Sequence, residues 1–247
     1  MSHETLPLVA LPEVYRLGPC HAPYREPCAS LEGHNLSVSV TPEAWQHIAR
    51  LGGQPLWRLT NPIGRFIDVH AALDDESVMA RVLGWASRAG LVERVPLYRA
   101  WFHYEEGSYY FECLTEAQAR REMDGDPASE LEVVPAWLGT SALVARTGAT
   151  QAAQGDARDY ALMAWVDVHC EQWALDGLWW WERLEPLELS APRGAIVPAA
   201  LANWSAHRIQ ARTVDDLEEI ARVAPTRWLG RPAHDKAPSP GPGPGPG

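Results

Sequence analysis

A carboxylate and a large indole ring are expected to lie side by side on one face of a strand within residues 174–204. The Asp176-Gly177 turn starts an aromatic run there, and the alternation of an extended chain puts Trp180 and Glu182 on the same face. In a cleft, Glu182 would be a catalytic or ligand-orienting acid. A glutamate at a strand end in water, beside tryptophans that only fill the core, explains the same pattern, so both interpretations stay open.

The same segment is expected to contain a second buried strand. The run SAPRG at 190–194 interrupts the apolar pattern with a proline and a glycine, and the apolar residues 195–197 follow it. Proline and glycine are typical of turns between strands. We therefore expect a polar turn at 190–194 between the aromatic strand and a closing strand.

Three further polar side chains lie in short strands near the start of the sequence. The expected strand 13–17 carries Arg16, and the strand 36–40 alternates so that Ser37 and Ser39 share a face. An ion pair with a nearby acid would explain Arg16, and an ordinary half-buried strand face would explain the serines.

The composition limits the classes of partner. The chain has 247 residues, a formal net charge of −11 and no run of lysines or arginines, so a non-specific nucleic-acid or anionic-membrane surface is not expected. A few arginines can still hold a dinucleotide in an acidic protein. Four scattered cysteines, no signal-peptide pattern and no membrane-length apolar window predict a protein of the reducing cytoplasm.

Other reaction classes lack their sequence signature. The cysteines and histidines within residues 20–34 match no paired-ligand zinc spacing, so we expect no metal. His169 and Cys170 are adjacent in an expected helix, where successive side chains point about 100° apart and share a proton poorly. No nucleophile elbow, phosphate loop or dinucleotide glycine fingerprint is present.

The remaining elements follow from capping and periodicity. We expect helices that start at Thr41, at Asp74 or Asp75, at Thr115 and after Thr213, together with a helix over 156–173. Hairpins are expected for 55–59 with 65–69 and for 97–104 with 108–113, and possible strands for LEVVPAWL and SALVA within 131–155.

The order of these segments resembles the ADP-ribosyltransferase superfamily, whose split-sheet fold binds NAD between an arginine or histidine on the first strand, a hydroxyl or tyrosine on a middle strand and a glutamate on a late strand. VYRL places Arg16 at the first motif, and LSVSVTPEAW offers Ser37 or Ser39 as the hydroxyl. PLWRL and RFIDVHAAL resemble the next segment, and LDGLWWWE, SAPRG and AIVPAAL resemble the glutamate strand and the closing strand. The resemblance covers roughly half the chain.

The resemblance implies an α+β fold with a split, mostly antiparallel sheet, flanking helices and an inserted strand-strand-helix unit. Residues 1–96 and 156–232 would form the core, 97–155 the insertion and 233–247 a disordered Pro/Gly tail. It also implies mono-ADP-ribosyl transfer from NAD to a macromolecule or small acceptor, as in bacterial conflict systems and toxins.

The resemblance assigns a role to each candidate residue. Glu182 would bind a ribose hydroxyl and stabilise the oxocarbenium character that develops when the nicotinamide bond breaks. Arg16 would hold a phosphate or ribose oxygen, Ser37 or Ser39 would orient the ribose, and Trp180 would stack on the nicotinamide.

Two departures from the family pattern leave other functions open. There is no Ser-Thr-Ser motif, and Trp180 stands where many members carry Glu or Gln two residues before the glutamate, so arginine modification is not implied. An inactive or repurposed fold remains an alternative, as does a non-catalytic binding or assembly protein that uses a tryptophan-rich groove. A hydrolase would require Asp68 to face Glu182 across a pocket.

Overall fold

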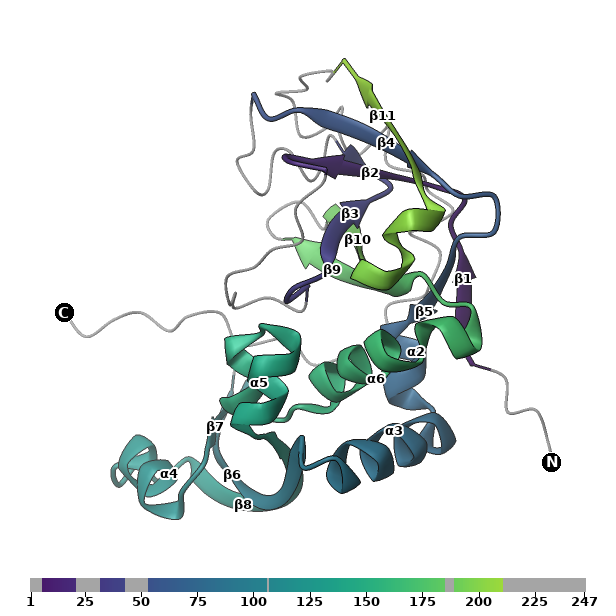
Figure 1. Ribbon diagram of the computed structural model, residues 1–247. Helices are drawn as coiled ribbons and strands as arrows, with labels where there is room; N and C mark the ends of the chain where they lie inside the picture. The colour runs from purple at the N-terminus through teal and green to yellow at the C-terminus, as the bar shows by residue number, and fades with distance from the viewer. Residues whose placement is uncertain (1–5, 21–31, 43–52, 106, 185–188, 211–247) are drawn as a thin grey trace.

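The structure, a computed structural model, describes residues 6–20, 32–42, 53–105, 107–184 and 189–210. They form an α+β fold around an eight-stranded, mostly antiparallel sheet with the order β1-β5-β9-β10-β3-β2-β4-β11 (Figure 1). Among the described pairs only β5 and β9 run parallel. The strands are β1 (Leu8–Ala10), β2 (Glu13–Leu17), β3 (Leu36–Ser39), β4 (Leu56–Thr60), β5 (Arg65–Asp68), β9 (Gly177–Leu184), β10 (Leu189–Ile196) and β11 (Ser205–Ile209).

Helices gather below β9 and β5 in Figure 1, where they cover that end of the sheet. They are α2 (Val69–Asp74), α3 (Glu76–Arg88), α5 (Ser141–Thr147) and α6 (Arg158–Trp173). The Asp75 side chain caps α3 by accepting from the backbone N–H groups of Ser77 and Val78, which confirms the predicted helix start. The helix predicted over 156–173 is confirmed as α6, and most of its apolar side chains enter the core.

The buried carboxylate of Asp176 fixes the start of β9. It accepts hydrogen bonds from the backbone N–H of Arg65 at 2.8 Å, from Nδ2 of Asn61 at 3.2 Å and from the indole Nε1 of Trp204 at 3.0 Å. The next residue, Gly177, must lack a side chain because a Cβ there would lie 1.8 Å from the Ala195 carbonyl oxygen. This close approach sets the pairing of β9 with β10.

The predicted hairpin of 55–59 with 65–69 is wrong, although both strands form. β4 lies between β2 and β11, whereas β5 lies between β1 and β9. The turn between them packs on the chain that links β1 to β2, where the Leu11 N–H donates to the Gly64 carbonyl at 2.9 Å. β4 and β5 are therefore consecutive in the sequence but are not hydrogen-bonded to each other in the sheet.

The turn predicted at 190–194 is also wrong, because β10 runs through it. Every residue of β10 has a partner on β9, from Leu189 opposite Leu184 to Ile196 opposite Gly177. Gly194 belongs in the strand for a packing reason, since a Cβ there would lie 2.9 Å from the Trp179 ring.

Several other segments differ from the sequence-based expectations. SALVA forms α5 instead of a strand, because a short apolar run fits either structure and Gly148, with φ at 71°, supplies a helix C-terminus. The sequence did not predict α2, β1 or β11. The helices expected from Thr41 and after Thr213 lie almost wholly or wholly outside the described residues.

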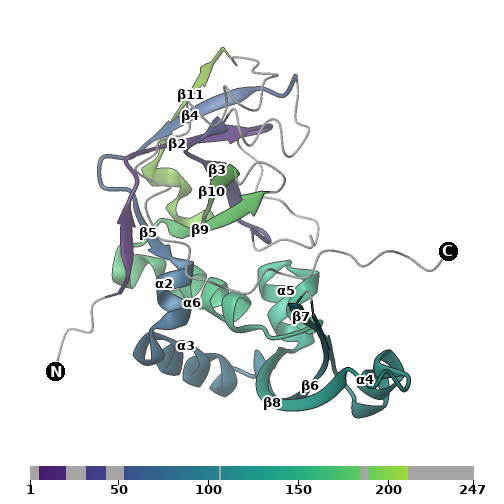
Figure 2. The same cartoon turned by 180° about the vertical axis from the view of Figure 1, so that it is seen from behind.

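A second sheet, the distal sheet, stands apart from the main one with the order β7-β6-β8 (Figures 1 and 2). It comprises β6 (Val92–Tyr104), β7 (Gly107–Cys113) and β8 (Ser129–Gly139), and α4 (Glu116–Met123) packs on one face. The predicted hairpin and the Thr115 cap are confirmed. β6 begins five residues before the expected 97–155 unit. No helix in the described part of the chain is long and apolar enough to cross a membrane.

Candidate functional site

The sheet order brings together strands that are far apart in the sequence. β9, β10, β3 and β2 are consecutive neighbours near the middle of the main sheet (Figure 2). The candidate residues of the first, middle and late strands are therefore carried by β2, β3 and β9, and β10 lies between β3 and β9.

One row of paired residues crosses these four strands. Arg193 on β10 lies opposite Trp180 on β9 and opposite Ser39 on β3, and Ser39 lies opposite Tyr15 on β2. Directly opposed residues of antiparallel strands point to the same face. The sheet thus presents an indole, a guanidinium, a hydroxyl and a phenol along one line.

A buried ion pair occupies this face, in a group of side chains that we call the Arg193 cluster: Glu32, Ser37, Trp180 and Arg193. Nη2 of Arg193 contacts Oε1 of Glu32, and the Ser37 hydroxyl donates to the same oxygen at 3.1 Å. The guanidinium lies over the Trp180 ring, 5.6 Å from its centroid. All four side chains are buried, so each charge depends on its partner for compensation.

Arg16 bonds to backbone carbonyl groups instead of joining the Arg193 cluster. Its Nη1 donates to the Ser37 carbonyl at 3.2 Å and its Nε to the Pro19 carbonyl at 3.3 Å. Arg16 leaves β2 on the opposite face from Tyr15, because neighbouring strand residues alternate. The side chain therefore ties β3 and the turn after β2 together. The predicted contact of Arg16 with a ligand stays a prediction.

Arg16 also affects the buried thiol of Cys20. Burial raises the pKa of this thiol, and the positive charge of Arg16 opposes part of that rise. The thiol is therefore held in its neutral form at neutral pH, and Cys20 acts as a small apolar residue of the core.

The two candidate serines have different surroundings. Ser37 faces the ion pair, as described above. Ser39 accepts from the Thr41 backbone N–H at 3.0 Å and lies 3.4 Å from the Thr41 hydroxyl, so it closes the turn at the end of β3. Ser37 is the stronger candidate for contact with a ligand.

Glu182 occupies a known place on the backbone. It lies on β9 opposite Ala191, two residues beyond Trp180. Its side chain is outside the described part of the structure, so the proposed contact of Glu182 with a ligand stays a prediction.

Asp68 and His169 are engaged elsewhere. Asp68 caps α2 by accepting from the Ala71 N–H at 3.0 Å, and it lies opposite Trp179, whose side chain points to the other face from Trp180. His169 lies 2.8 Å from the Trp165 carbonyl through Nδ1 and stacks on the same residue's ring. Within the described ranges, no group of three or more potential metal ligands occurs.

Sequence reasoning missed Glu32 and the role of Arg193. The proline and glycine around Arg193 indicated a turn. Had the segment been taken as a strand, alternation would have placed Arg193 and Ala195 on the same face. No local signal marks Glu32, because its partner comes from the far end of the chain and only the sheet order joins them.

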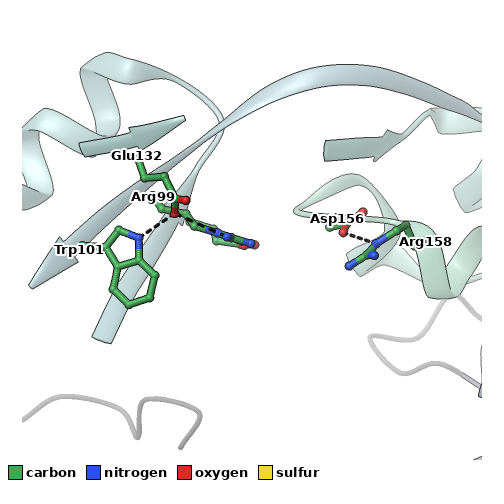
Figure 3. A network of polar contacts seen from close by, with 6 residues as sticks. Arg99, Trp101, Glu132, Asp156 and Arg158 are labelled. Carbon is green, nitrogen blue, oxygen red and sulfur yellow. Dashed lines mark hydrogen bonds and ion pairs between the residues drawn. The ribbon is translucent and has the colours of Figure 1, made fainter. Parts of the chain in front are cut away.

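The distal sheet carries a second polar surface on the face away from α4, which we call the distal face: Arg99, Trp101, Tyr110, Glu112 and Glu132. Figure 3 shows the Trp101 indole pointing to Glu132, with a hydrogen bond of 2.8 Å, and Arg99 beside them. Arg99 also pairs with Glu112 at 3.1 Å and lies over the Tyr110 ring. These side chains are only half-buried, so the distal face is in contact with water.

Comparison with family models, with curated proteins and with solved structures finds no match to this chain. Its function is therefore inferred from its own residues and their geometry.

Proposed function

We propose that this chain binds NAD on the face of the main sheet that carries the Arg193 cluster and transfers ADP-ribose to a macromolecular or small acceptor. The observation that supports this function is the strand order. The first-motif strand β2, the hydroxyl strand β3 and the late strands β10 and β9 are consecutive neighbours in the main sheet, which supports an ADP-ribosyltransferase type of arrangement.

The roles of the two arginines change in this proposal. Arg16 is engaged by two carbonyl groups and acts as a positioning residue for β3. Arg193 takes the anion-binding role, because its guanidinium lies on the same face as Ser37 and Trp180. A phosphate oxygen of NAD would bind the Arg193 guanidinium beside the Glu32 carboxylate, through charge-assisted hydrogen bonds.

Transfer of ADP-ribose needs a carboxylate near the ribose and a flat apolar surface for the nicotinamide ring. The bond between the ribose C1 and the nicotinamide nitrogen breaks, and its electron pair stays on the nicotinamide, which leaves as a neutral ring. The acceptor nucleophile bonds to C1 and loses its proton to solvent. Glu182 would stabilise the positive charge on the sugar in the transition state, and the Trp180 indole would hold the nicotinamide.

Nicotinamide release by purified protein tests this function. Wild-type protein should bind NAD in calorimetry and release nicotinamide, and Glu182→Ala should slow release by about 100-fold or more with an unchanged melting temperature. Glu130→Ala is the matched control, because Glu130 is an exposed acid on the distal sheet. Absence of any heat signal at millimolar NAD would overturn the proposal.

The distal face favours a second candidate, a non-catalytic binding protein. Its half-exposed Trp101 and Tyr110 rings lie 4.5 Å apart between centroids, and two glutamates flank them. Exposed aromatic side chains beside charged groups are typical of protein contacts. If Trp101→Ala abolished the biological activity of the chain while Glu182→Ala left it intact, this second function would replace the first.

A further inference from the structure

The carboxylate of Glu32 uses only one of its two oxygens within the Arg193 cluster. Oε1 contacts Nη2 of Arg193 and accepts from the Ser37 hydroxyl. Oε2 is buried, and across the described ranges of the chain it has no hydrogen-bond partner. Glu32 as a whole is 4% exposed, so bulk water does not hydrogen-bond to this oxygen as it would at a surface.

A buried carboxylate oxygen of this kind is an acceptor without a donor. Buried polar atoms are nearly always hydrogen-bonded, because leaving one unpaired in a poorly solvated place is costly. The local charge is already balanced, since Arg193 pairs with the other oxygen. A second cation would leave an excess positive charge in the cluster, so a neutral donor suits Oε2 best.

The groups around Glu32 favour a sugar hydroxyl as the hydrogen-bond donor to Oε2. The Arg193 guanidinium, which lies over the Trp180 ring, suits a phosphate, and the buried indole is an apolar neighbour beside which a sugar or base would lie. A molecule with a hydroxyl, a ring and a phosphate fits these three groups together. Carboxylates accept strong hydrogen bonds from hydroxyls, with donor–acceptor distances of about 2.5–2.7 Å.

We propose that Oε2 of Glu32 accepts a hydrogen bond from a ribose hydroxyl of the bound nucleotide, so that Glu32 is a ligand-binding residue. This inference rests on the proposed function, since it takes NAD as the ligand. It differs from the role given to Glu182, which acts on the charge of the transition state. Glu32 contributes to binding in the ground state and to the choice of ribose over a deoxy sugar.

Calorimetry with NAD and two analogues, each lacking the 2′-hydroxyl of one ribose, tests the inference on wild-type protein and on Glu32→Gln. For wild type, one analogue should bind about 10- to 100-fold more weakly than NAD. For Glu32→Gln, the same analogue should bind within about threefold of NAD, because the charged acceptor is gone. Glu130→Gln, which changes an exposed acid on the distal sheet, should behave as wild type.

The outcomes separate the two proposals. Absence of NAD binding by wild type overturns the proposed function and this inference with it. NAD binding with an equal loss for the analogue in wild type and in Glu32→Gln overturns the inference alone. Should Glu32→Gln fail to fold by circular dichroism, the wild-type comparison decides: binding of both analogues as tightly as NAD overturns the inference.

Discussion

Arg193 and Trp180 lie directly opposite each other on β10 and β9, with the guanidinium 5.6 Å from the centroid of the indole ring. Glu32 contacts the same guanidinium, so the cation has both a ring face and a carboxylate as neighbours. Cation–π contacts gain strength when the cation is desolvated, and Arg193 is buried. The arrangement gives the centre of the sheet a fixed positive charge with its own internal counter-ion.

Loss of either charge of this pair should destabilise the fold strongly. Arg193→Ala should lower the free energy of unfolding by about 3–5 kcal/mol, because it leaves the buried Glu32 carboxylate uncompensated. The double variant Arg193→Met with Glu32→Leu should be more stable than Arg193→Ala, since it leaves no buried charge. Urea unfolding of Arg193→Met, Glu32→Leu and the double variant completes a cycle, and a loss in the double variant equal to the sum of the two single losses would contradict the pairing.

Substitution of Arg16 should separate its structural role from ligand binding. Lys has one compact ammonium and cannot reach the Ser37 and Pro19 carbonyls with the fixed geometry of a guanidinium. Arg16→Lys should therefore lower the unfolding free energy by about 1–2 kcal/mol while NAD affinity changes less than about threefold. Unchanged stability with a large loss of NAD affinity would restore Arg16 as a direct ligand contact.

The sequence predicted best those features that depend on neighbours along the chain. The caps at Asp75 and Thr115 and the stripe of α6 are set by side chains within one or two turns, so local chemistry was sufficient to place them. The α+β class with a mostly antiparallel sheet, which the resemblance in segment order implied, is also confirmed.

Pairing of strands could not be predicted in the same way. The turn at 61–64 indicated a reversal, but the choice of partner strand depends on the link between β1 and β2, which packs on Gly64. At 190–194 the proline and glycine belong to a strand because the Trp179 ring needs the space beside Gly194. Such contacts between distant segments have no local signal, and the same holds for the pair of Glu32 with Arg193.

Asp176 should be one of the most sensitive positions of the main sheet. Its carboxylate accepts from Arg65, Asn61 and Trp204, so it joins the start of β9 to the turn after β4 and to the chain before β11. Asn offers one oxygen and places an amide donor against one of these donors. Asp176→Asn should cost about 2–4 kcal/mol in thermal or urea unfolding, whereas Asp74→Asn, at an exposed site, should cost less than about 0.5 kcal/mol. Equal losses of unfolding free energy in Asp176→Asn and Asp74→Asn would show that the Asp176 carboxylate does not hold these three segments together.

The carboxyl of Asp159, in the first turn of α6, should make stability depend on pH. Burial, with a smaller contribution from the charge of Asp156, raises its pKa from 3.8 to about 6. The unfolded chain ionises this group more easily than the folded protein, so its contribution to stability is present in full below about pH 4 and is lost as pH rises through about 6. At pH 7.5 the ionised group should cost about 1–3 kcal/mol.

Asp159→Asn removes this titration and keeps an oxygen that can accept from the Tyr160 N–H, as Asp159 does at 2.8 Å. The variant should be more stable than wild type by about 1–3 kcal/mol at pH 7.5, and the difference should vanish near pH 4. Urea unfolding at half-unit pH steps measures both curves. Parallel curves from pH 4 to 7.5 would show that the folded protein holds Asp159 with the same proton affinity as the unfolded chain, contrary to the desolvation that its place in α6 imposes.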